Sequence, residues 1–257
     1  MKEFGINLKK TKSIDLSLYN KKNDNWINIT NIIFKDILPF NDIQNNLVNL
    51  SLGISVESSY NYNKIESSGI ENINNLKSLK KLKLVRFNFI NTFILECYKL
   101  EDLKLIYCEN LKIGQSVCQT IKKLCLEEYK ILKVEQLLKL PLLETLILRN
   151  NPHKKSEYHK SERHGRLCSK GRYVEKIYFE KEYNLIIDYN SLTNLKNLEA
   201  DNCEFLDFEN TSLEKVELFS KININDIEEK LLIEKLISMK TLKNISLYLK
   251  KIKCEKF

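Results

Sequence analysis

Four stretches of the sequence share one pattern, LKKLKLVRF (79–87), LEDLKLIYC (100–108), IKKLCLEEY (121–129) and LETLILRNN (143–151). Each has an apolar residue at its first, fourth and sixth positions, and the stretches start 21, 21 and 22 residues apart. The pattern recurs at LVNLSLGIS (47–55), VEKIYFEKE (174–182), LKNLEADNC (195–203), LEKVELFSK (213–221) and LKNISLYLK (242–250), and more loosely at SIDLSLYN (13–20). A regular interval of this length predicts about ten structural repeats.

The spacing of the apolar positions indicates what each repeat forms. Successive side chains of a strand point to opposite faces, so the fourth and sixth positions share one face and the residues between them share the other. One such repeat, which we call a coil, cannot cover its own apolar face. Coils therefore stack, with parallel strands about 4.8 Å apart. We expect an α/β fold with a parallel sheet of about ten short strands.

The pattern resembles the leucine-rich repeat family, whose unit is LxxLxLxxN/CxL with a period of about 20–29 residues. The ninth position holds Cys108, Asn151 and Cys203 in three coils. The resemblance implies a horseshoe solenoid with a concave parallel sheet, helices and loops on the convex side, and partner binding on the concave face. The abundance of Lys, Asn and Ile also resembles divergent repeat families of microsporidia and insect poxviruses, which implies a host-directed interaction.

The repeats divide the chain into one domain with three parts. We predict an irregular N-terminal coil or cap (1–46), repeats (47–224) with an insertion at 152–173, and a C-terminal helix, last strand and basic tail (225–257). Apolar spacing and capping residues predict helices at three places, 26–40, 133–141 (closed by Pro141) and 225–240.

The outward positions of the strands mix charged, apolar and aromatic side chains, which suits a protein interface. The charge of this face changes from basic near Lys81 to acidic near Glu217, which favours a protein partner over a uniformly anionic nucleic acid. The alternative is a solvated sheet face whose composition reflects strand propensity. The predicted partner contacts are Lys81, Lys83, Arg86, Lys104, Ile106, Tyr107, Ile147, Arg149, Tyr178 and Phe219.

The insertion at 152–173 contains all three histidines of the chain and carries seven basic residues against two acidic ones. It predicts a second, alternative function, the binding of RNA or an anionic surface. His153, His159, His164 and Cys168 do not form the compact pairs that are typical of zinc sites, so we predict no metal. The candidate polyanion contacts are Lys154, Lys155, Arg163, Arg166, Lys170 and Arg172.

Composition and motifs restrict the remaining functions. The sequence has neither phosphate-binding glycine motifs nor GxSxG or HExxH motifs, so we expect no enzyme, no catalytic residue and no cofactor. An odd number of scattered cysteines favours a reducing, cytoplasmic location, or export if a signal peptide has been removed, and no membrane span is expected. The run 32–52 weakly resembles an F-box, which keeps a ubiquitin-ligase substrate adaptor as a minor alternative.

Overall fold

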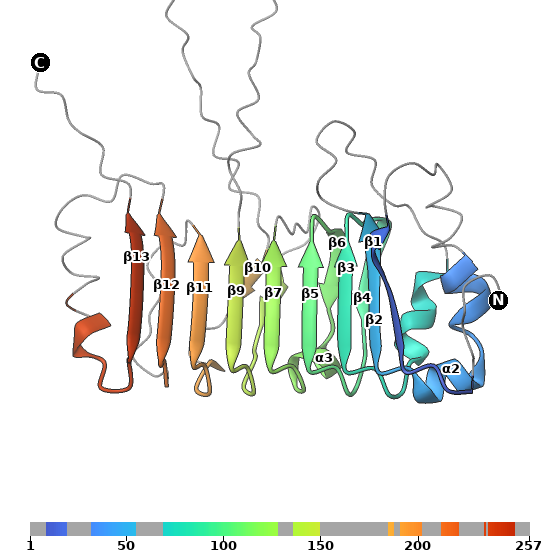
Figure 1. Cartoon of the computed structure of the whole chain (residues 1–257), viewed down its shortest axis with the longest axis horizontal. Helices are drawn as coiled ribbons and strands as arrows, with labels where there is room; N and C mark the ends of the chain where they lie inside the picture. Colours follow the sequence, from blue (N-terminus) through green and yellow to red (C-terminus); the bar gives the residue numbers. More distant parts are fainter. Residues whose placement is uncertain are drawn as a thin grey trace, which may run out of the picture.

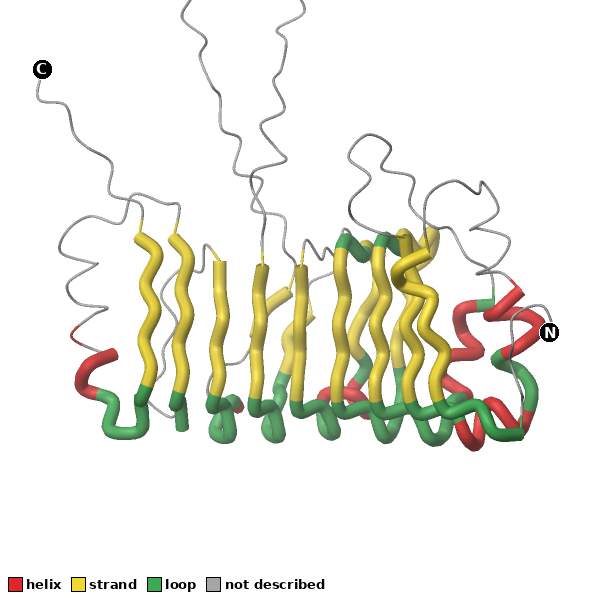
Figure 2. The backbone as a smooth tube through the Cα atoms, viewed as in Figure 1, coloured by secondary structure: helices red, strands yellow, loops and turns green. Residues whose placement is uncertain are grey.

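The computed structural model of the 257-residue chain is shown in Figures 1 and 2. The residues that it describes are 9–19, 32–54, 69–127, 136–149, 185–187, 191–201, 212–220, 234 and 236–249.

One long parallel sheet organises the described residues, and its strands stand side by side with the same direction (Figure 1). The sheet is open, with β1 and β13 at its two edges, and does not close into a barrel. This confirms the prediction of an α/β fold with a mostly parallel sheet of short strands. In spatial order the strands are β1 (Ser13–Tyr19), β2 (Asn49–Ile54), β3 (Lys81–Val85), β5 (Asp102–Ile106), β7 (Lys123–Glu127), β9 (Thr145–Arg149), β11 (Asn197–Asp201), β12 (Lys215–Ser220) and β13 (Asn244–Leu249).

The back face of this sheet is the hydrophobic core. Fourth-position residues of successive coils are direct neighbours, so Leu82, Leu103 and Leu124 form one continuous column. From Leu50 to Val216 the members of this column are at most 2% exposed. A fully buried leucine contributes about 2 kcal/mol through the apolar area that it removes from water. The repeated apolar positions therefore determine both the strand direction and the register.

A second layer and several short helices cover the back face (Figures 1 and 2). Phe34 in the first helix contacts Phe87, with 6.0 Å between the ring centroids, so the N-terminal helices pack against the coil of β3. The second layer consists of β4 (Asn88–Leu95) paired with β6 (Glu109–Ile113) and β8 (Gln136–Leu138) paired with β10 (Leu185–Ile187). The helices are η2 (Ile33–Ile37, a π-helix), α2 (Asn41–Asn46), η3 (Ile70–Asn75, a 3-10 helix) and α3 (Gln115–Cys118).

The ninth position of the repeat has a structural role. Cys108 is fully buried, and its Sγ–H donates to the carbonyl of Leu84 in the preceding coil at 3.4 Å. Burial raises the pKa of this thiol to about 12, so it stays protonated. Cys108 thus fills the slot that the repeat pattern predicts, whereas Cys203 lies outside the described residues.

Charged side chains alternate in sign where the strands begin. The second positions of successive coils are Lys80, Glu101, Lys122, Glu144, Lys196, Glu214 and Lys243. The Nζ–Oε distances are 3.2 Å for Lys80–Glu101, 3.3 Å for Lys122–Glu101, 3.5 Å for Lys196–Glu144 and 2.7 Å for Lys243–Glu214. Exposed pairs contribute at most about 1 kcal/mol each, but an alternating series also disfavours any order of coils that brings like charges together.

The predicted strand at 174–182 lies outside the described residues. β9 pairs directly with β11, with Leu146 opposite Leu198, so no strand lies between them. The main sheet therefore has nine strands among the described residues, and the prediction of a further strand of this sheet between β9 and β11 was wrong.

The helix predictions had mixed outcomes. Residues 136–138 form strand β8 instead of a helix, because pairing with β10 satisfies their backbone and overrides the helical spacing of the leucines. Within 26–40, Ile33–Ile37 is helical, in the π form. Within 225–240, residues 234 and 236–238 are helical and Leu236 is buried in the core. Residues 26–31, 225–233 and 235 lie outside the described residues.

Candidate interaction face

The face opposite the core, which we call the front face, presents the third and fifth positions of every coil. Strand register aligns these positions into two rows that cross the sheet. The first row contains Ser13, Asn49, Lys81, Asp102, Lys123, Thr145, Asn197, Lys215 and Asn244. The second row contains Asp15, Ser51, Lys83, Lys104, Cys125, Ile147, Glu199, Glu217 and Ser246.

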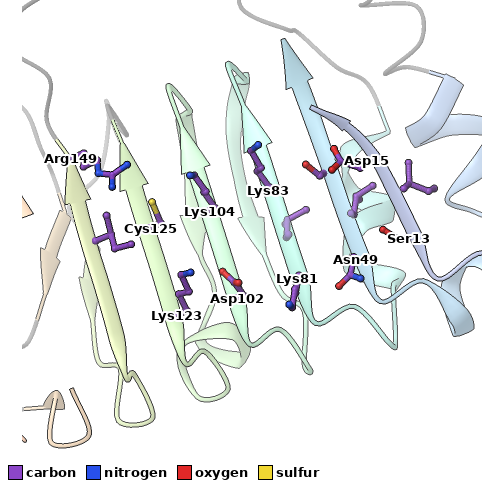
Figure 3. Close-up of a pocket in the computed structure, with 15 residues that line it drawn as sticks. Ser13, Asp15, Asn49, Lys81, Lys83, Asp102, Lys104, Lys123, Cys125 and Arg149 are labelled. Atoms are coloured by element: carbon purple, nitrogen blue, oxygen red, sulfur yellow. The ribbon is translucent and has the colours of Figure 1, made fainter. Parts of the chain in front are cut away.

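Four lysines gather on the front of β3, β5 and β7 (Figure 3). Lys83 and Lys104 are direct neighbours in the second row, and Lys81 and Lys123 lie on either side of Asp102 in the first. In contrast to the lysines where the strands begin, Lys81, Lys104 and Lys123 form no ion pair with a carboxylate of the described residues. Lys81, Lys104 and Lys123 are therefore available to an anionic ligand, whereas Lys83 already takes part in another interaction.

The charge reverses toward the other end of the sheet. Glu199 and Glu217 are direct neighbours in the second row. Each also has a cation beside it, since Arg149 Nε donates to Glu199 Oε1 at 2.6 Å and Lys215 Nζ lies 3.6 Å from Glu217 Oε2. The hydrogen bond to Glu199 raises the pKa of Arg149 above its ordinary value. The acidic part is thus partly neutralised, and the lysine part carries the stronger net field.

Cys125 and Ile147 separate the two charged parts in the second row. Cys125 faces outward, as the alternation predicts, but is only 2% exposed. Burial raises the pKa of its thiol, and the nearby cations Lys104 and Arg149 counteract that increase only in part. The thiol is therefore covered and protonated near neutral pH, and the half-buried Ile147 is the more accessible apolar group of the two.

A shallow groove of about 290 Å³ follows the front face from β1 to β9 (Figure 3). Its walls include the four lysines, and its floor on β2 includes Asn49 and Ser51. Asn49 Oδ1 and Ser51 Oγ are buried without a hydrogen-bond partner among the described residues. A ligand donor that reaches either atom would satisfy a group that otherwise costs about 1–3 kcal/mol.

An aromatic pair lies beyond the acidic part. Phe219 on β12 stacks on Tyr248 on β13, with centroids 4.6 Å apart and planes 3° apart. Tyr248 is 56% exposed, so the pair offers an apolar contact surface at one end of the front face.

Most of the predicted partner contacts that fall on described residues lie on the front face. Two of them are not accessible there, because Arg86 is 5% exposed and Ile106 is 6% exposed. The reason is local: Arg86 and Tyr107 adopt positive φ values of 65° and 54°, so the chain leaves the strand and the simple alternation ends. Arg86 then lies over the ring of Tyr107, with its Cζ 5.7 Å from the centroid. Lys81, Lys83, Lys104, Ile147, Arg149 and Phe219 remain on the front face as predicted.

The other predicted contacts cannot be placed in this face. Tyr178 lies outside the described residues, and the sheet has no strand between β9 and β11 to present it. The whole polyanion set of 152–173 also lies outside them. Sequence analysis missed Asn49 and Ser51, although they occupy the third and fifth positions of LVNLSLGIS.

No protein-family model matches the sequence, and no curated protein matches it either.

Among the described residues no three His, Cys, Asp or Glu side chains are grouped so as to hold a metal ion. Within the same part of the chain, every helix is too short or too polar to cross a bilayer.

Proposed function

We propose that this chain is a leucine-rich repeat solenoid that binds a protein partner on its front face and catalyses no reaction. The repeat LxxLxL at about 21 residues supports the family assignment, together with one parallel strand per coil and the buried cysteine at the ninth position. The binding of a protein partner is proposed from the chemistry of the front face and not from the repeat, since the same repeat serves many roles.

The observation that carries the proposal is the contrast between two rows of charges. Where the strands begin, lysine and glutamate alternate and pair with each other. In the second row of the front face, like charges are neighbours, Lys83 with Lys104 and Glu199 with Glu217. Like charges side by side destabilise the folded chain. Arg149 and Lys215 offset the Glu199–Glu217 pair, but Lys104 has no carboxylate partner among the described residues, so its place beside Lys83 is not explained by stability. A partner with complementary charges explains it.

The buried thiols support a non-catalytic role. Burial raises the pKa of Cys97 and Cys108 to about 12 and that of Cys118 to about 11. Thiols with such values are not thiolates near neutral pH and make poor nucleophiles.

The test is partner capture from the source cell with a charge-reversed front face. The variant Lys83→Glu/Lys104→Glu should lose the captured partner. The variant Lys77→Glu/Lys99→Glu is the matched control, because it makes the same charge change at exposed turn residues before the same two strands, β3 and β5. Loss with the first variant and retention with the second supports the proposal. Equal capture by both variants refutes binding on the front face.

A further inference from the structure

The second row of the front face has an order of chemistry that specifies a ligand. Along adjacent strands from β3 to β12 it reads Lys83, Lys104, Cys125, Ile147, Glu199 and Glu217. The row is thus two cations, two small or apolar groups and two anions. We propose that the front face binds an extended segment of the partner that crosses the strands, an inference that rests on the proposed function. The segment has acidic residues at one end, apolar residues in the middle and basic residues at the other end.

The dimensions of the row fit a short peptide. Six adjacent parallel strands about 4.8 Å apart span about 24 Å. An extended chain advances about 3.3 Å per residue, so about eight residues cover this distance. The acidic end then lies over β3 and β5, the middle pair over β7 and β9, and the basic end over β11 and β12.

The two ends of this segment are not equivalent in strength. Arg149 and Lys215 already contact Glu199 and Glu217, so the basic end of the ligand must compete with cations of the protein itself. Lys104 has no carboxylate partner among the described residues. Lys83 already takes part in another interaction. Lys104 is therefore the main anchor for the acidic end of the ligand, and the basic end determines the direction of the ligand across the sheet.

The order of charges also separates this ligand from a polyanion. A nucleic acid or a uniformly acidic segment would place negative charge over Glu199 and Glu217, which repel it. An ordered segment avoids this repulsion, because its basic end lies over the same two carboxylates. Composition alone therefore does not define the ligand; the sequence of charges does.

The experiment measures binding of the full chain to capped synthetic octapeptides by fluorescence anisotropy at low ionic strength. The ordered peptide is Glu-Glu-Ser-Leu-Val-Ser-Lys-Lys, and it is tested together with its reversed sequence. The control is Glu-Lys-Ser-Leu-Val-Ser-Glu-Lys, which has the same composition and the same net charge. We expect one of the two ordered peptides to bind at least about tenfold more tightly than the control.

Two variants test whether the preference for an ordered peptide depends on the second row. Lys83→Glu/Lys104→Glu should remove it, and Lys77→Glu/Lys99→Glu should leave it unchanged. The proposal is overturned if neither ordered peptide binds more tightly than the control. It is also overturned if heparin or an all-glutamate peptide of the same length competes with the ordered peptide and binds more tightly.

The same variants separate this inference from the proposed function. If Lys83→Glu/Lys104→Glu abolishes partner capture while no ordered peptide is preferred, the front face binds a partner and the charge order proposed here is wrong. If capture survives this change, the proposed function itself fails.

Discussion

Leu103→Ala should destabilise the protein far more than Ile245→Ala, although both residues occupy the fourth position of a coil. Leu103 is fully buried and has Leu82 and Leu124 as neighbours in its column. Truncation there removes apolar contacts and leaves a cavity, for which we expect a loss of about 3–4 kcal/mol. Ile245 is 42% exposed, and in the described residues its column continues only to Val216. A partly exposed site leaves no closed cavity, so we expect about 1–1.5 kcal/mol.

The assay is thermal and urea unfolding followed by far-UV circular dichroism. For a chain of this size, about 1 kcal/mol corresponds to roughly 2–4 °C in Tm, so Leu103→Ala should lower Tm by about 6–16 °C. Ile245→Ala should lower it by no more than about 6 °C. Because repeat arrays can lose cooperativity at their ends, both urea and thermal midpoints are compared. Equal shifts for the two variants would refute a core concentrated in the central coils.

Three further outcomes are expected. Glu101→Gln should cost at most about 1 kcal/mol at neutral pH, because hydrogen bonds from two lysines hold the pKa of the Glu101 carboxyl below its ordinary value. The difference from wild type, measured by urea unfolding against pH, should disappear as pH falls through that lowered pKa, and a difference that grows in acid contradicts the ion-pair explanation. Cys108 should react with a thiol reagent at neutral pH only as fast as the protein unfolds, a rate that mass spectrometry measures; fast labelling of the folded chain would show that the thiol is accessible. Replacing the basic residues of 152–173 by alanine should abolish any salt-sensitive RNA binding, measured by filter retention; binding that survives this change excludes the segment as the contact.

The periodicity predicted the fold because it shows which residues must be buried, and their burial determines how the strands stack. The apolar residues at the fourth and sixth positions of the coils can be buried together only if the strands stack in parallel and in register, and Leu82, Leu103 and Leu124 do so. The prediction failed where a second interaction competes with periodicity. Gln136–Leu138 has helical spacing but pairs with β10, and this contact is distant in sequence.

The sequence predicted which side chains of the candidate site face the front within each strand, but not the side chains that follow the end of a strand. Lys83 and Lys104 lie where strict alternation puts them. Arg86 lies three residues beyond Lys83, where the positive φ value turns the chain and buries the guanidinium. Nothing in an LxxLxL pattern indicates that turn.

Because the back face of the sheet supplies most of the stability, the front face can carry a specific order of charges. Stability resides in the back columns, where each leucine contacts neighbours in both adjacent coils, and in the paired charges where the strands begin. Lys104 and Glu217 contribute to neither. Their substitution changes the electrostatic field of the front face at little cost to folding, since surface changes away from core contacts are usually within about 0.5 kcal/mol. A stacked sheet of this kind therefore lets the second row change one coil at a time without loss of the fold, as the proposed recognition of an ordered ligand requires.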